Sequence, residues 1–209
     1  MARARPAPPP LGPLPPPPSD FDIYLLPVIH LDRPWQRVHG CAHGPIYFNR
    51  GNTARFNAPN GEYGTLYVGD SLACCFVETF GHLDTPAATT VRSVSEAQLR
   101  DACVTEVVPT RPLTLVDLTG PGLRRIEADA RLIAGNYSES QRWSLAIWAH
   151  PTQPDGILYP ARHDPSLQSV ALFDRARDAV VAAATHPLST LDDAELAVLL
   201  DRYNVSLRP

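Results

Sequence analysis

The chain has 209 residues, of which 44% are hydrophobic, and it carries a formal net charge of −4. A chain of this length fits one domain plus a tail, because domains commonly hold about 100–150 residues. The acidic balance opposes binding to duplex nucleic acid, for which a basic face is expected. The basic residues are all arginine, which excludes a Walker-type lysine, a Schiff-base lysine and a pyridoxal-phosphate anchor.

Cysteine spacing and hydropathy indicate the compartment. The four cysteines, Cys41, Cys74, Cys75 and Cys103, contain no Cys-x-x-Cys pair, so neither a disulfide framework nor a thiolate zinc site is predicted. Buried free thiols in a reducing compartment are expected instead. The N-terminal stretch lacks the apolar core of a signal peptide, and no segment approaches the roughly 18 apolar residues of a membrane helix. We therefore expect a cytoplasmic protein.

Proline dominates residues 1–20. Such a run favours extended polyproline II and cannot pack a core. We predict a disordered or semi-rigid extension over residues 1–20, followed by a single catalytic domain over residues 21–209. A plain spacer, a mis-assigned start codon and an SH3-type ligand are alternative interpretations of the extension.

Strands and helices are both predicted along the domain. Strands are expected over residues 35–39, 45–48, 65–69, 104–108, 113–118, 156–159 and 169–173. Helices are expected from Asp70 or Ser71 to about Gly81, after a Ser95–Gln98 capping box, and over residues 123–134, 138–148 and 192–203. Residues 179–184 are compatible with either structure. Because strands and helices do not alternate regularly, an α+β fold is favoured over a doubly wound one.

The stretch from Arg55 to Glu78 concentrates the candidate chemistry. Arg55 can clamp a diphosphate through two parallel N–H bonds. Tyr67 can present a flat face to an aromatic ring, and Glu78 can stabilise a sugar cation as a glycosidic bond breaks. Together these groups suit a nucleotide-sugar bond such as the one joining nicotinamide to ribose in NAD.

Each of these residues also has a structural alternative. Arg55 would be a surface arginine unless Asn57 and Gly61 shape its loop around a phosphate. Tyr67 would be a core aromatic residue, and Glu78 would lie on the exposed stripe of its helix. Arg37, in the first strand, either points outward or requires an anionic partner.

The sequence contains no motif for a metal site, a serine hydrolase or a dinucleotide-binding fold. The seven histidines match no known ligand spacing, so no metal is expected. A Gly-x-Ser-x-Gly elbow and a Gly-x-Gly-x-x-Gly fingerprint are both absent from the sequence, which disfavours a serine hydrolase and a redox role for NAD. No resident cofactor is predicted.

Taken together and in order, these pieces resemble the RES domain family. The resemblance runs from about Trp35 to Phe173 and rests on four pieces. They are Arg37-Val38, Arg55-Phe-Asn57 with Gly61, Leu66-Tyr67 with Asp70-Ser71 leading to Glu78, and Asp155-Gly156-Ile-Leu-Tyr159-Pro-Ala161-Arg162 followed by Ala171-Leu172-Phe173.

The resemblance implies an ADP-ribosyltransferase-like fold, a split and mostly antiparallel sheet with helices around an NAD cleft. It also implies a toxin that degrades NAD by hydrolysis or phosphorolysis and is held inactive by an Xre-like antitoxin. Arg55, Tyr67 and Glu78 match the family arginine, tyrosine and glutamate. The chain departs from the family at Ala161, where serine is frequent, and neither Ser166 nor Ser169 matches that position.

The resulting hypothesis makes NAD the substrate. Arg55, with Arg37 or Arg162, holds the diphosphate, Asn57 contributes to binding, Tyr67 stacks on nicotinamide or ribose, and Glu78 stabilises the ribose cation. Two alternatives stay open: transfer of ADP-ribose to a macromolecule, and a catalytically weak binding module in which Ala161 signals lost activity. The sequence predicts no direct contact with nucleic acid or membrane, and it leaves a homo-oligomer open.

Overall fold

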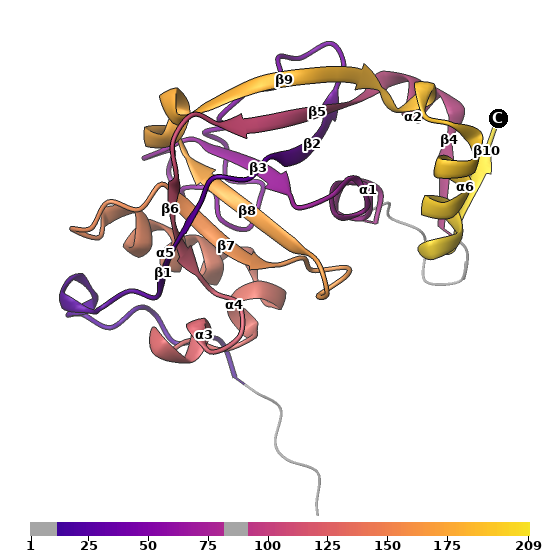
Figure 1. The fold of residues 1–209 in the computed structure, drawn as a ribbon. Coiled ribbons are helices and arrows are strands. Elements are labelled where there is room, and N and C mark those ends of the chain that lie inside the picture. The colour runs from indigo at the N-terminus through magenta and orange to yellow at the C-terminus, as the bar shows by residue number, and fades with distance from the viewer. Residues whose placement is uncertain (1–11, 82–91) are drawn as a thin grey trace, which may run out of the picture.

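The computed structural model describes residues 12–81 and 92–209 (Figure 1). One sheet contains β1 (Val28–Leu31), β2 (Trp35–Gly40), β3 (Thr65–Gly69), β5 (Ala102–Pro109), β6 (Leu113–Asp117), β7 (Gly156–Pro160), β8 (Gln168–Phe173) and β9 (Val180–Pro187). The order of its eight strands is β1-β6-β7-β8-β3-β2-β5-β9. All neighbours in this sheet are antiparallel except β6 and β7. The predicted α+β class with a split, mostly antiparallel sheet is confirmed.

Helices and a small second sheet surround the large sheet (Figure 1). The helices are α1 (Leu72–Phe80), α2 (Glu96–Asp101), α3 (Gly122–Arg125), α4 (Arg131–Ala134), α5 (Tyr137–Ala149) and α6 (Asp193–Arg202). The second sheet pairs β4 (Arg92–Ser95) with β10 (Val205–Arg208) in parallel. Within residues 12–81 and 92–209, no helix has both the length and the apolar character needed to cross a membrane.

The large sheet is split between β2 and β3. These two neighbours are paired at a single position, Gln36 opposite Gly69. By contrast, β3 pairs with β8 over five positions and β2 pairs with β5 over six. The Arg37 guanidinium spans the split, because its Nη1 donates a hydrogen bond to the Tyr67 carbonyl at 3.2 Å. The two halves of the sheet therefore separate at this point.

Helix α1 begins at the end of β3 and borders the split. Ser71, one of the two caps that the sequence allowed, accepts a hydrogen bond from the Cys74 N–H. Its buried face packs Phe76 and Phe80 into a cluster with Leu99 and Leu199 from α2 and α6. This packing fixes the rotation of α1 and leaves Glu78, which is only half buried, on the side away from that cluster.

Strands β7 and β8 lie in the centre of the sheet and are covered on both faces. Ile157 and Phe173 pack with Trp143 and Ile147 of α5 in one cluster, whereas Leu158 belongs to a second cluster. Burial on both faces explains why the sequences of these strands are continuously apolar and do not alternate between apolar and polar residues. Gly156 has no room for a side chain, because a Cβ there would collide with the Ala171 carbonyl.

Residues 12–20 lie against the domain, whereas the sequence predicted a disordered or semi-rigid extension over residues 1–20 that cannot pack a core. Leu14 is 3% exposed. Its N–H donates to Glu139 at 3.1 Å, and the indole of Trp143 donates to the Pro15 carbonyl at 2.9 Å. Prolines lack an N–H group but keep their carbonyl acceptors, so a proline-rich segment can still dock through acceptors and one buried leucine. Residues 1–11 lie outside the described residues, and the domain boundary at residue 20 stays a prediction.

Three local predictions differ from the structure. Residues 45–48 form no strand, and only an isolated bridge joins Asn49 to Thr65. The helix expected over residues 123–134 is divided into α3 and α4, with Glu127 between them at a φ of 63°. The Ser138–Gln141 capping box does not form, because the Gln141 amide donates to the Asn52 and Ala54 carbonyls. The ambiguous residues 179–184 fall mainly in β9.

A disulfide joins Cys41 to Cys103, so the prediction of four free thiols is wrong for this pair. The two cysteines are 62 residues apart in sequence, and no spacing rule connects them. Strand pairing brings them together, because the β2–β5 register places His39 opposite Cys103 and Gly40 opposite Ala102. Cys74 and Cys75 are free and buried, as predicted.

We expect reduction of this disulfide to lower the free energy of unfolding by about 2–4 kcal/mol, because the open chain regains conformational freedom when unfolded. Denaturant unfolding with and without a reductant measures the difference. The matched control is the double variant Cys41→Ser, Cys103→Ser, whose stability should not respond to the reductant. Equal stability of the parent protein under both conditions would contradict the expectation.

Candidate active site

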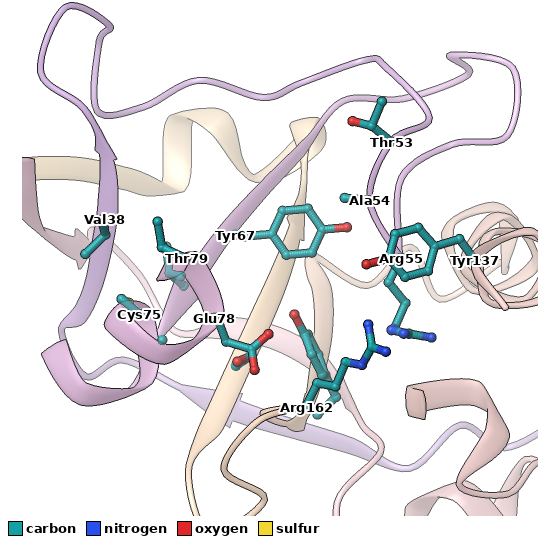
Figure 2. Close-up of a pocket in the computed structure, with 14 residues that line it drawn as sticks. Val38, Thr53, Ala54, Arg55, Tyr67, Cys75, Glu78, Thr79, Tyr137 and Arg162 are labelled. Carbon is teal, nitrogen blue, oxygen red and sulfur yellow. The ribbon is translucent and has the colours of Figure 1, made fainter. Parts of the chain in front are cut away.

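A cavity of about 550 Å³ lies at the split in the sheet (Figure 2). Its wall is formed by Val38, Thr53, Ala54, Arg55, Tyr67, Val68, Gly69, Cys75, Glu78, Thr79, Tyr137, Tyr159, Arg162 and Ser169. These residues come from β2, the loop after it, β3, α1, α5, β7, the turn after β7, and β8. The volume lies within the roughly 300–1,000 Å³ typical of sites for small molecules and cofactors.

Arg55 is held rigidly at one side of this cavity. It is 7% exposed. Its Nη1 donates to the Gly135 carbonyl at 2.8 Å and to the Ser140 hydroxyl at 3.1 Å, and its guanidinium lies 4.8 Å from the ring centre of Tyr137. Burial lowers the pKa of Arg55, and the positive charge of Arg162 lowers it further.

One end of the Arg55 guanidinium remains unsatisfied. Its Nη2 is buried and has no hydrogen-bond partner among residues 12–81 and 92–209. A buried cationic donor without a partner is costly, and an anion bound in the cavity would offset that cost. Arg55 is therefore arranged to bind an anionic group.

Tyr67 faces the cavity with its ring and uses its hydroxyl inside the protein. The hydroxyl donates to Asn57 Oδ1 at 3.0 Å and accepts from the Phe56 N–H at 2.9 Å. Burial raises the pKa of Tyr67 well above its ordinary value, so the phenol stays neutral. The ring is thereby fixed as a flat surface on which an aromatic group can stack.

Asn57 does not reach the cavity, although the sequence suggested that it binds substrate. Its side chain is fully buried. Its Nδ2 donates to the Gly51 carbonyl at 2.5 Å while its Oδ1 accepts from Tyr67. Through these two bonds Asn57 positions the Tyr67 hydroxyl and the loop.

Glu78 points into the cavity from the last turn of α1. Its Oε1 accepts a hydrogen bond from the His163 N–H at 3.0 Å. This contact ties α1 to the turn that also carries Arg162. Figure 2 shows the Arg162 side chain between Glu78 and Arg55. Within the described ranges, no hydrogen bond or ion pair holds the Arg162 guanidinium, so it is available to a ligand.

Arg37 does not line this cavity, although the sequence suggested that it shares the site. It lines a separate cavity of about 460 Å³ together with His39, His43 and Tyr47. Its neighbour Val38 lines the site cavity instead. Successive side chains of a strand point to opposite faces, so the position of Val38 directs Arg37 away from the site.

Tyr137, Tyr159 and Ser169 are among the lining residues that the sequence reasoning did not place in the site. Tyr137 is the first residue of α5, and only the packing of α5 against the Arg55 loop reveals its role. Ala161 is buried, with 1% of its surface exposed, and does not line the cavity. Among the described residues, no group of three or more histidine, cysteine or acidic side chains is arranged to hold a metal ion.

Three comparisons with known proteins found similar sequences and a similar fold. The model of the RES domain family matches residues 34–197. A Sinorhizobium fredii protein named probable toxin y4kH is 34% identical over 113 residues, which are 53% of this chain and 87% of that protein. A chain in the crystal structure of the M. tuberculosis MbcT–MbcA toxin–antitoxin complex matches with a TM-score of 0.64 at 20% identity. That match covers 82% of this chain and 91% of the other. Because the sequences are only 20% identical, the match shows a shared fold and no more.

We expect Tyr67→Phe to lower the free energy of unfolding by about 1–3 kcal/mol, because the buried Phe56 N–H loses its acceptor. Chemical denaturation measures the change. Tyr47→Phe is the matched control, since Tyr47 is 58% exposed and should tolerate the same deletion. Equal stability of the two variants would show that the Tyr67 hydroxyl does not stabilise the fold.

Proposed function

The chain belongs to the RES domain family, and from this premise we propose that it is an enzyme that cleaves the nicotinamide–ribose bond of NAD. The observation that carries the proposal is the convergence of Arg55, Tyr67 and Glu78 on one cavity. These residues were selected from the sequence for diphosphate binding, ring stacking and cation stabilisation. All three residues line this cavity although they come from a loop, a strand and a helix.

The charged groups and aromatic rings of the cavity suit the diphosphate, the bases and the reacting ribose of a dinucleotide. The guanidinium groups of Arg55 and Arg162 offer donors to the diphosphate, with Arg55 contributing its unpaired Nη2. The rings of Tyr67 and Tyr137 supply faces for stacking on nicotinamide or adenine. Glu78 supplies the negative charge that the reacting ribose requires.

Cleavage in this arrangement breaks the bond between ribose C1′ and the pyridinium nitrogen. The bonding electrons pass to that nitrogen, so nicotinamide leaves as a neutral molecule and needs no general acid. Positive charge develops on C1′ and the ring oxygen, and the Glu78 carboxylate stabilises it more in the transition state than in the ground state. Water or phosphate then bonds to C1′ and releases a proton when water is the acceptor.

We further propose that the protein is the toxin of a toxin–antitoxin pair. Two findings support this: the printed name of the Sinorhizobium fredii relative and the printed title of the complex that shares this fold. An Xre-like antitoxin is the expected partner. Such a partner would hold the NAD-degrading activity in check in the cell that makes both proteins.

We expect Glu78→Gln to lower kcat for NAD cleavage by about 100–1,000-fold, because it keeps the shape of the side chain and removes its charge. Nicotinamide release by purified protein is the measurement, made with and without inorganic phosphate. Glu96→Gln is the matched control, because Glu96 lies on α2, where its side chain is 58% exposed, and does not line the cavity.

The products separate the alternatives. Free ADP-ribose indicates hydrolysis, and a phosphorylated sugar product indicates phosphorolysis. Label from NAD that ends on a macromolecule would replace the proposal with an ADP-ribosyltransferase. A parent protein that binds NAD without consuming it would instead indicate a binding module.

A further inference from the structure

Ser169 supplies a buried hydroxyl to the cavity. It lies on β8 directly opposite Tyr159 of β7 in the antiparallel register. Both residues line the cavity, with Ser169 4% and Tyr159 6% exposed. A directly opposite pair on one face of a sheet is close enough for side chains to interact.

The two side chains lie opposite each other beside the groups of the site. The register places Ser169 and Tyr159 as cross-strand neighbours, and Tyr67 and Glu78 act electrostatically on the Tyr159 phenol, each raising its pKa. Ser169 Oγ lies 3.3 Å from Cys74 Sγ of α1, and this contact holds the serine side chain in place. Burial raises the pKa of Tyr159 well above its ordinary value, so its phenol keeps its proton and can donate it in a hydrogen bond.

The ring of Tyr159 is held independently of its hydroxyl. It packs edge-on against Phe56, with ring centres 4.7 Å apart. Removal of the hydroxyl alone therefore leaves the ring anchored. The hydroxyl is free to serve a ligand because the fold does not depend on it for packing.

From this geometry we infer that Tyr159 donates a hydrogen bond to the sugar of the substrate beside Glu78, and that Ser169 positions the Tyr159 hydroxyl for this contact. The inference rests on the proposed function, which places a ribose next to Glu78. Hydrogen bonds to a sugar hydroxyl that strengthen in the transition state are a recognised source of rate enhancement in glycosidic cleavage. Tyr159 is thus a further catalytic residue, and Ser169 is a positioning residue that acts through it.

The inference also accounts for Ala161. The resemblance to the family led us to expect a serine at this position, yet Ala161 lies outside the cavity lining and its N–H donates to the Leu167 carbonyl. Ser166 is exposed and bonds to Asp164. The chain therefore retains a serine hydroxyl in the cavity, contributed by Ser169 from the neighbouring strand.

The test compares nicotinamide release by the parent, Tyr159→Phe, Ser169→Ala and the double variant. We expect Tyr159→Phe to lower kcat by about 10–100-fold with a smaller change in KM, since one hydrogen bond in the reacting complex is lost. Ser169→Ala should lower kcat in the parent background. In the Tyr159→Phe background it should have little further effect, because a positioning residue has no role once its target is gone.

Controls separate positioning from folding. Ser166→Ala removes an exposed serine hydroxyl outside the cavity and should leave kcat unchanged. Thermal unfolding confirms that each variant is folded, and Tyr159→Phe alone decides the catalytic part of the inference if Ser169→Ala unfolds. An unchanged kcat for Tyr159→Phe overturns the inference, and so does an equal loss from Ser169→Ala in both backgrounds. A parent that consumes no NAD overturns the proposed function together with this inference, whereas an active parent confines any failure to Tyr159 and Ser169.

Discussion

The candidate site depends on the interruption of backbone hydrogen bonding between two neighbouring strands, β2 and β3. Strands β2 and β3 share one paired position, and beyond it the Arg37 guanidinium, not a backbone N–H, reaches the Tyr67 carbonyl. A buried carbonyl left without a donor would be costly, so this contact satisfies the Tyr67 carbonyl where the two halves of the sheet separate. The opening that results is the space into which the ring of Tyr67 and the carboxylate of Glu78 project (Figure 2).

Rigid surroundings then hold each functional group at the edge of the opening. Arg55 is fixed by a carbonyl and a hydroxyl from the α4–α5 region, and Tyr67 is fixed by the Arg55 loop itself. Glu78 is fixed by a backbone N–H from the turn after β7. Each group is therefore oriented before a ligand arrives, so little ordering remains to oppose binding.

Arg55 Nη2 is one of the buried donors that lack a partner among the described residues, and Arg55 lines this cavity. Buried donors in folded proteins are nearly always satisfied, and an exception commonly marks a binding or catalytic role. Here the exception lies on a cation with a second arginine nearby, and the two positive charges raise the cost of leaving the cavity without an anion. An anionic group between them would remove that cost, which is why the geometry favours an anionic ligand over a neutral one.

Local sequence determined much of this protein. Ser71 as an N-cap, the Ser95–Gln98 capping box and the apolar runs of β3, β7 and β8 were predictable because each depends on residues close together in the chain. Arg55, Tyr67 and Glu78 were chosen from the sequence by their chemical types and order, and all three line one cavity. Only the tertiary structure decided the contacts that join distant segments. It paired Cys41 with Cys103, docked Leu14 on α5, directed Arg37 out of the site and brought Tyr137 and Ser169 into it. These outcomes depend on strand register and on which face of an element is buried, and neither is encoded in the spacing of nearby residues.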